Sequence, residues 1–251
     1  MGRSHENKSN SRSFNFVDCF GVDKCGDYYS RIDLLNKSQA GFTLVEIAIV
    51  LVIVGLLIGG VLKSQEMITN AKLKRIESDN AGLLTAVYLY QDRYLRFPGD
   101  DADAEGRFSI YVAADNPNGN GDAAIGVGGD WDLPITTAWA DGTQETLKFF
   151  GHLRAAGLIA GGALDSARPS NAFGGPIGVQ NNSLGMSGMV TIFGAIDGPV
   201  AKILDRRLDD GVSNTGRVRS QDVGSAAGMA GSEAADATYD DQVSYNMAFR
   251  L

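Results

Sequence analysis

The feature that most constrains the fold is an uninterrupted apolar run from Phe42 to Leu62. Glu46 is its only charged residue, and Thr43 is its only other side chain that carries a polar group. As an α-helix, a run of about 20 residues rises about 30 Å, which is the thickness of the hydrocarbon core of a bilayer. A helix also satisfies its backbone N–H and C=O groups internally, where no water is available. We therefore expect a transmembrane helix over 42–62.

Glu46 is unexpected in such a run. A carboxylate at the centre of a spanning helix costs about 2.5–3.5 kcal/mol on insertion scales, and less near an interface. Ionisable residues inside membranes are for this reason candidates for function. The alternative is that Glu46 lies at headgroup depth, near the start of the helix, and has no role.

The residues around Glu46 resemble the processing site of type IV pilins and of the pseudopilins of type II secretion. The sequence GFTLVE at 41–46 combines a glycine, a phenylalanine after it, a glutamate at the fifth position from that phenylalanine, and a long apolar continuation. The resemblance implies that prepilin peptidase, a membrane aspartyl peptidase, cuts between Gly41 and Phe42 and methylates the new amino terminus of Phe42. Residues 1–41 would then be a leader that is removed. It also implies that Glu46 sets the register between neighbouring subunits.

The residue types suit this chemistry. Glycine has no Cβ, so the backbone at Gly41 can extend into a protease groove without a side-chain clash. The carboxylate of Glu46 can meet the terminal amine of Phe42 of an adjacent subunit inside the membrane. Pairing two charges removes much of the cost of leaving either alone, and so selects one axial register.

Two departures distinguish the sequence from many major pilins. Its two cysteines, Cys19 and Cys25, both lie in the predicted leader, where we expect no structural role for them, so the processed chain would lack the carboxy-terminal disulfide loop. Lys63 stands where a stalk proline is common. These departures favour a minor pilin or a pseudopilin.

A conventional secretory signal is the competing interpretation of this stretch. Such a signal has an apolar core of about 7–15 residues followed by a cleavage site of small residues. Gly59-Gly60 is a poor match to that site. Basic residues flank the run on both sides and do not choose an orientation. From the cleavage motif we expect a single-pass protein of the inner membrane, with its head on the periplasmic or outer side.

Beyond Lys63 the sequence predicts that the same helix continues and becomes amphipathic. Apolar side chains recur at helical spacing along one face, and charged residues occupy the other. Pro98-Gly99 should end the helix, so we predict a stalk over 42–95. The apolar face consists of Ile68, Ile76, Leu83, Val87, Tyr90 and Tyr94.

Residues 96–251 are predicted to form a globular α+β head, with a small antiparallel sheet packed against the stalk in a pilin-like arrangement. We expect helices over 146–158 and 199–208, and a mobile loop over 223–238. Strands are predicted over Ser109–Ala113, Met189–Ile196 and Val243–Phe249.

The overall charge bears on the class of partner. The 251 residues carry 22 basic and 30 acidic side chains, for a net charge of −8. An acidic balance argues against a broad nucleic-acid-binding surface, so we expect no nucleic-acid partner.

One stretch of the head is rich in oxygen ligands. The sequence DNPNGNGD at 115–122 is jointed by glycines and could wrap a calcium ion, as the heads of some pseudopilins do. It lacks the glutamate that an EF-hand loop requires at its twelfth position. Glycine and asparagine also dominate turns for conformational reasons, so a plain turn is the alternative. The candidate ligands are Asp115, Asn118, Asn120 and Asp122.

No residue pattern indicates an enzyme. His152, the one histidine after the predicted cut, adjoins an aromatic pair in a predicted helix, and we expect it to be packed or exposed and not catalytic. The segment GMSG at 185–188 does not have the spacing of a hydrolase nucleophile elbow. Asp100, Asp101 and Asp103 form an acidic cluster that we expect to be solvated.

The sequence therefore predicts a structural, non-enzymatic subunit of a type IV pilus or a type II secretion pseudopilus. Its partners would be prepilin peptidase, the inner membrane and other pilin subunits in a helical filament. No cofactor is required, although calcium is a candidate. The alternative is a membrane-anchored head with a binding or enzymatic function that uses the pilin-like stalk only as an anchor.

Overall fold

The computed structural model describes residues 41–126, 131, 145–165, 167–224 and 238–251. The chain divides into two compact units, residues 1–59 and 60–251, and helix α2 (Leu44–Tyr94) contributes to both. The predicted leader, apart from Gly41, lies outside the described residues, as does most of the predicted loop over 223–238.

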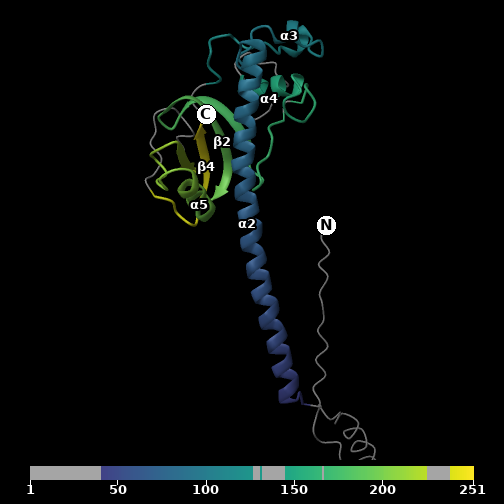
Figure 1. Cartoon of the computed structure of the whole chain (residues 1–251), viewed down its shortest axis with the longest axis vertical. Helices are drawn as coiled ribbons and strands as arrows, with labels where there is room; N and C mark the ends of the chain where they lie inside the picture. The colour runs from purple at the N-terminus through teal and green to yellow at the C-terminus, as the bar shows by residue number, and fades with distance from the viewer. Residues whose placement is uncertain (1–40, 127–130, 132–144, 166, 225–237) are drawn as a thin grey trace, which may run out of the picture. The chain divides into compact units, whose positions relative to one another are not determined.

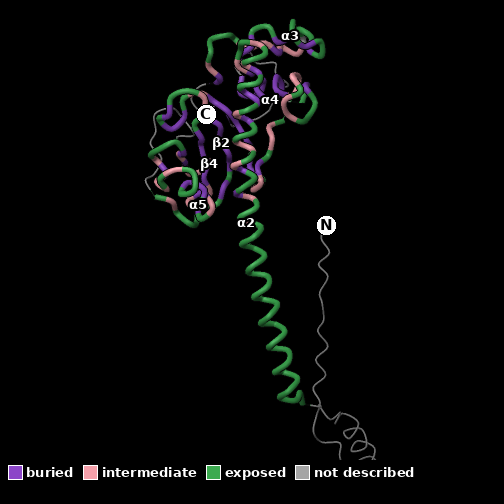
Figure 2. Tube along the Cα trace, in the orientation of Figure 1, coloured by how far each residue is buried: buried purple, intermediate pink, exposed green. Residues whose placement is uncertain are grey.

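The first part of α2 is apolar and exposed around its whole circumference. Every residue from 41 to 68 is exposed, as the green tube of Figure 2 shows. Leu44 is 90% exposed and Leu56 is 74% exposed. Among the described residues, α2 is the one helix that is long and apolar enough to cross a membrane. A continuous apolar surface of this size requires a lipid or protein environment, which fits a single-pass membrane protein.

The second part of α2 buries one face in the head. The predicted apolar face is confirmed from Ile76 to Tyr90, but it is wrong at Ile68, which is 56% exposed. Ile68 comes before Leu73, the first buried residue of the helix, so the head does not reach it. The helix ends at Tyr94 as predicted, and Leu95 leaves it with a left-handed φ of 57°. The buried residues of α2 are Leu73, Ile76, Leu83, Ala86, Val87 and Tyr90.

The head contains one antiparallel sheet with the strand order β1-β2-β4-β3 (Figure 1). Its strands are β1 (Ile177–Ser183), β2 (Met186–Asp197), β3 (Val218–Asp222) and β4 (Ser244–Arg250). The strands predicted over 189–196 and 243–249 are confirmed as β2 and β4. Strands β1 and β3 were not predicted, because their polar residues, such as Gln180 to Ser183, lack the β-branched and aromatic character of typical strands.

Successive side chains of β2 point to opposite faces of the sheet, which explains why an apolar cluster packs on each face. Phe193 belongs to the main core, together with Ile177 and Val179 of β1, Met247 of β4 and the buried face of α2. Val190 and Ile192 point to the other face of the sheet and pack in a second cluster with Trp131 and Leu184. Thr191 lies on the α2 side, where its Oγ1 donates to Asn80 Oδ1 of α2 at 2.5 Å. The α+β, pilin-like fold class is thus confirmed.

In the described part of the head, the short helical segments are α3 (Ala104–Arg107), η2 (Ala113–Asp115), α4 (Glu145–Ala155) and α5 (Gly198–Leu208). Helix α5 matches its prediction, and α4 matches but ends earlier, before a turn at Ala156–Leu158. The strand predicted over 109–113 is wrong. Phe108 and Tyr111 are the buried residues there, and the Tyr111 N–H donates to the Phe108 carbonyl at 3.0 Å, so the apolar spacing reflects a turn.

Two isoleucines of α2 test this packing. Replacement of Ile76, which is fully buried, by alanine should lower the free energy of unfolding by about 2–5 kcal/mol, because it removes core contacts and leaves a cavity. Ile68→Ala is the matched control on the same helix, and its effect should stay within about 0.5 kcal/mol. Denaturant titration of the detergent-solubilised chain measures both. Equal effects of the two substitutions would contradict this account of the core.

Candidate functional site

The segment before α2 has no regular secondary structure and is accessible. Residues 41–43 have no regular secondary structure, and Phe42 is 82% exposed. A Cβ built on Gly41 meets no atom within 4 Å. The fold of the chain therefore does not require glycine at this position, so a requirement for it would have to come from another molecule.

Glu46 forms a capping box with Thr43 at the start of α2. Glu46 Oε2 accepts hydrogen bonds from the Thr43 N–H and from Thr43 Oγ1, both at 2.9 Å. In return, the Glu46 N–H donates to Thr43 Oγ1 at 3.2 Å. The Thr-x-x-Glu pattern of a capping box is readable in the sequence at 43–46, but the sequence analysis considered only the charge of Glu46.

After α2, three segments come into backbone contact. Gly99 has a φ of +91°, and a Cβ there would lie 2.7 Å from the Glu145 carbonyl oxygen at the start of α4. A Cβ on Gly119 would lie 2.4 Å from the Gly99 carbonyl oxygen. Because a Cβ at either position would clash with the backbone, only glycine allows these close contacts. The end of the stalk, the loop around residue 119 and α4 are held together at this point.

This junction gathers three carboxylates from three segments. One oxygen each of Asp100, Asp122 and Glu145 lies within 4.8 Å of the other two. Asp100 and Glu145 are buried, with 3% and 4% of their surface exposed, whereas Asp122 is exposed. Asp100 Oδ2 accepts from the Ala123 N–H at 3.0 Å, but the buried Asp100 Oδ1 has no hydrogen-bond partner.

The other two carboxylates also accept hydrogen bonds from the loop, and Asp122 Oδ2 accepts from Asn120 Nδ2 at 2.9 Å. The Asn120 N–H donates to Glu145 Oε1 at 2.9 Å, and the Ala124 N–H donates to Asp122 Oδ1 at 2.8 Å. Burial raises the pKa of Asp100 and of Glu145, and the neighbouring carboxylates raise both further. Within the described part of the chain, none of the three forms an ion pair.

Of the two aspartates among the four residues predicted as calcium ligands, Asp122 belongs to this group of carboxylates and Asp115 does not. Asp115 and the two asparagines shape the loop. Asp115 Oδ2 accepts from the Val112 N–H at 3.0 Å, Asn118 Oδ1 from the Glu105 N–H at 2.9 Å, and Asn120 Oδ1 from the Asp122 N–H at 2.8 Å. Asp100 and Glu145 were missed because they are distant in sequence, and no local spacing connects them to Asp122.

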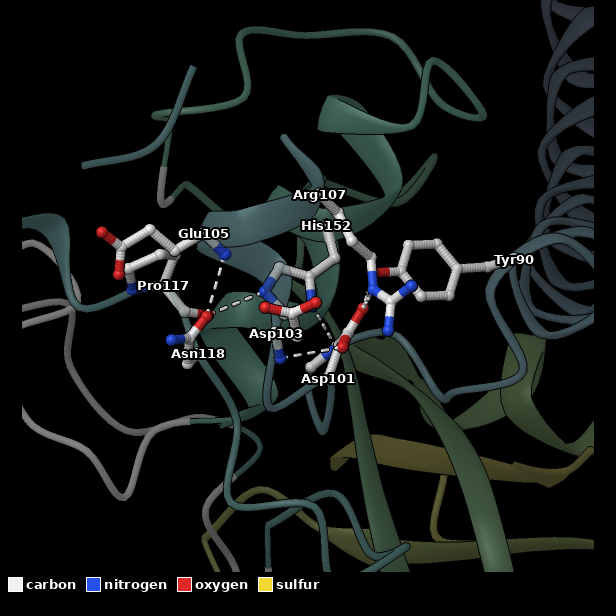
Figure 3. Close-up of polar contacts among 9 residues, drawn as sticks. Tyr90, Asp101, Asp103, Glu105, Arg107, Pro117, Asn118 and His152 are labelled. Atoms are coloured by element: carbon white, nitrogen blue, oxygen red, sulfur yellow. Dashed lines mark hydrogen bonds and ion pairs between the residues drawn. The ribbon is translucent and has the colours of Figure 1, made fainter. Parts of the chain in front are cut away.

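Asp101 anchors a second, fully hydrogen-bonded network (Figure 3). Its Oδ2 accepts from Tyr90 Oη of α2 at 2.9 Å and pairs with Arg107 Nε of α3 at 2.7 Å, while its Oδ1 accepts from the Asp103 N–H at 3.1 Å. The prediction that the acidic cluster is solvated is therefore wrong for Asp100 and Asp101, which are buried. Burial and the Asp101 charge raise the pKa of Tyr90, so that its hydroxyl stays protonated and donates.

His152 connects the same three segments with both ring nitrogens (Figure 3). Nδ1 accepts from the Gly99 N–H at 2.9 Å, which places the ring proton on Nε2, where it is donated to the Pro117 carbonyl oxygen at 2.8 Å. The side chain is fully buried, and burial lowers its pKa from 6.5 to about 4. Of the two expected placements of His152, packed or exposed, the structure shows the packed one, and the ring serves as a neutral link.

A second acidic group, Asp205, Asp209 and Asp210, follows α5 and differs in its hydrogen bonding. Asp205 accepts from Tyr239 Oη at 2.7 Å and from the Gly211 N–H at 3.3 Å. Asp209 and Asp210 accept backbone N–H groups and the Thr215 hydroxyl. These three carboxylates therefore accept hydrogen bonds from residues of the chain around them.

Residues 36–62 match the family model described as the prokaryotic N-terminal methylation motif. This motif is the signature of type IV pilins and pseudopilins, so the predicted resemblance is confirmed over the processing site and the apolar run. Comparison with curated proteins and with solved structures finds no match. The motif, the exposed apolar part of α2 and the four-stranded sheet together are pilin-like, and they fit a membrane-anchored precursor.

His152 predicts a specific dependence of stability on pH. Because the folded chain binds this proton only near pH 4 and the unfolded chain binds it near pH 6.5, the free energy of unfolding should fall as the pH is lowered through this range. The contribution is at most about 3 kcal/mol. His152→Gln retains an acceptor and a donor but does not titrate. Its free energy of unfolding should therefore lack this dependence on pH.

The measurement is denaturant unfolding of both proteins between pH 4 and 7. Asp100, Glu145 and Asp205 have raised pKa values, and they contribute with the opposite sign in both proteins. The difference between the two proteins therefore isolates His152. A difference that does not change with pH would show that His152 does not titrate as described.

Proposed function

We propose that this chain is a structural subunit of a type IV pilus or of a type II secretion pseudopilus. It would be stored in the inner membrane as a single-pass precursor with its head on the periplasmic or outer side. Prepilin peptidase would cut it between Gly41 and Phe42, and the processed subunit would join other pilin subunits in a helical filament. The observation that carries the proposal is the methylation motif in front of an apolar helix that is exposed on all sides.

The cleavage step is supported by the accessibility of the site. A protease needs an extended segment that it can bind, and residues 41–43 precede the helix without regular structure. Gly41 contacts no described side chain, so the peptidase can approach it without unfolding any of the described structure. Cleavage would create a new amino terminus at Phe42, one residue before the helix-capping Thr43, which places the methylated amine beside the capping box.

The assembly step is supported by the two oxygens of Glu46. Oε2 caps the helix through Thr43, whereas Oε1 accepts no hydrogen bond within the described part of the chain. A carboxylate can use one oxygen for its own helix and the other for the Phe42 amine of a neighbouring subunit. In hydrocarbon, a charge without a partner is costly, so this pairing would favour the one axial register in which it forms.

Processing can be tested with two glycine substitutions that the fold should tolerate equally. Gly41→Ala should abolish the peptidase-dependent cut, because the added methyl obstructs the protease and not the chain. Gly55→Ala is the matched control, since a Cβ there also meets no atom within 4 Å. Intact mass and amino-terminal sequencing of membrane-extracted protein, with and without prepilin peptidase, should show a methylated Phe42 for the wild type and for Gly55→Ala. A start at any other residue in the wild type would refute the proposed cut.

Two substitutions can separate the role of the Glu46 charge in assembly from the role of its side chain in capping the helix. Glu46→Gln preserves the capping pattern and removes the charge, so it should be processed normally but incorporated into filaments at least about tenfold less. Thr43→Ala weakens the cap and keeps the charge, so assembly should largely persist. Quantitative immunoblotting of sheared filaments against the membrane pool measures both. Normal assembly of Glu46→Gln would exclude charge pairing, and a loss confined to Thr43→Ala would assign the effect to the cap.

A further inference from the structure

Positive charge gathers in two segments of the chain, residues 63–75 of α2 and residues 198–208 of α5. Together they contain seven basic and two acidic residues, a net charge of +5. The rest of the chain from residue 42 onward contains nine basic and 23 acidic residues, a net charge of −14. Widening the segments to 63–79 and 198–210 adds four acidic residues and still leaves +1 against −10. The two segments are therefore a positive region of an acidic protein.

The fold places these two segments side by side (Figure 1). Arg207, in the last turn of α5, donates from Nη2 to Asn70 Oδ1 of α2 at 2.6 Å, and its Nη1 lies 4.0 Å from Glu77 Oε1. Residues seven apart, two turns of an α-helix, lie on one face, so Asn70 and Glu77 share a face of α2. Lys74 lies between them on this face, and Lys63 lies seven residues before Asn70. A stripe with Lys63 and Lys74 thus runs along α2 to α5.

The outward face of α5 is basic around an exposed apolar side chain. The helix buries Ala201 and Leu204 in the head. Ile203 is 42% exposed, Arg206 is also exposed, and Lys202 is half-buried. Within the described part of the chain, neither Lys202 nor Arg206 forms an ion pair. A short helix with one buried face and basic residues beside an exposed apolar one is suited to the interface of a membrane.

The basic stripe of α2 begins where the apolar run ends. Lys63 directly follows Leu62, and Asn70 lies eight residues beyond Leu62, which is about 12 Å along a helix. The headgroups extend roughly 5–8 Å beyond the hydrocarbon core. In physiological salt, charges interact over about another 8 Å. With Leu62 at the edge of the core, Arg207 beside Asn70 therefore lies within the range of headgroup charges.

We propose that the stripe of Lys63 and Lys74 and the outward face of α5, with Lys202, Ile203, Arg206 and Arg207, dock on anionic lipid headgroups of the membrane that stores the subunit. We call these residues the basic face. The inference rests on the proposed insertion of residues 42–62 in a membrane, and not on cleavage or assembly. Docking would hold the head on the bilayer during storage.

The charges of the basic face favour this docking. Each lysine or arginine near an anionic surface strengthens binding about fivefold. Ile203 adds apolar area that can enter the boundary between headgroups and acyl chains. Lys63 pairs with Glu66 at 2.8 Å, but both side chains are largely exposed, and such a pair contributes little. Anionic headgroups can therefore compete with it.

A second copy of this chain is the other partner of matching charge, because the rest of its surface is acidic. The lipid surface is favoured by continuity, since the stripe starts at the residue that follows the apolar run. Insertion of that run would bring the basic face to the bilayer in a single chain, whereas contact with a second copy requires association.

The test measures lysine acetylation by mass spectrometry, with the full chain in lipid nanodiscs at one chain per disc. Discs of phosphatidylcholine are compared with discs that also contain phosphatidylglycerol. Anionic lipid should slow acetylation of Lys74 and Lys202 by about fivefold or more, and high salt should restore it. Lys72 is the internal control, because it lies two residues from Lys74 but on another face of α2, 5.0 Å over the Phe173 ring. Equal slowing of Lys72 and Lys74 would show only a general surface potential and would overturn the proposal.

Substitutions then test the basic face directly. The double substitution Ile203→Gln and Arg206→Gln changes two exposed positions of α5, so the chain should fold, and most of the protection of Lys74 should be lost. Arg96→Gln is the matched control, because it removes an exposed charge beyond the other end of α2 and should leave the protection unchanged. Full protection in the double variant would contradict docking through α5.

Two further outcomes separate this inference from the proposed function. Incorporation into both kinds of disc without protection of Lys74 would overturn the docking alone, whereas failure to incorporate into either would overturn the proposed membrane storage as well. Protection that appears only with two or more chains per disc would assign the basic face to a second copy and would also overturn docking on lipid.

Discussion

The structure depends on removing the apolar surface of α2 from water, and the two parts of this helix meet that requirement in different ways. From Leu73 to Tyr90 one face is buried in the head, against the sheet, α4 and the loops, and the opposite face carries charged residues. From residue 44 to residue 68 the helix is exposed throughout, and no described segment of its own chain covers it. A bilayer would cover that part. The same continuous helix is therefore part of a folded head at one end and suited to a membrane at the other.

The end of α2 has to be held rigidly if the head and the stalk are to keep a fixed arrangement. Gly99 and Gly119 allow the backbones to touch, and His152 and Asp101 then fill the junction with hydrogen bonds to α2, α3 and the loop. These groups are buried and uncharged or paired, which makes the junction stable without any ligand. Asp100 is the exception, because one of its oxygens is buried and has no donor.

The sequence was sufficient to predict features that depend on local periodicity and failed for those that depend on distant contacts. The apolar run, the stripe from Ile76 to Tyr90 and the alternation in β2 are local patterns, and each was predicted correctly. Strand β1 was missed because its polar residues are stabilised by neighbouring strands. The group of Asp100, Asp122 and Glu145 was missed because the fold, and not residue spacing, brings these side chains together. The buried Asp101 misled sequence reasoning for the same reason, since adjacent aspartates look solvated until their donors are known.

Glu46 and Asp100, near opposite ends of α2, have a similar pattern of hydrogen bonds. Glu46 uses one oxygen to cap its own helix and offers the other, and Asp100 uses one oxygen for the Ala123 N–H and leaves the other unpaired. In an environment of low polarity, a carboxylate in this state gains more from an external cation than it would in water. At Glu46 that cation would be the amine of another subunit, which links chains. The proposed pairing would form only in a filament, so loss of the Glu46 charge should affect assembly and leave the stability of the head unchanged.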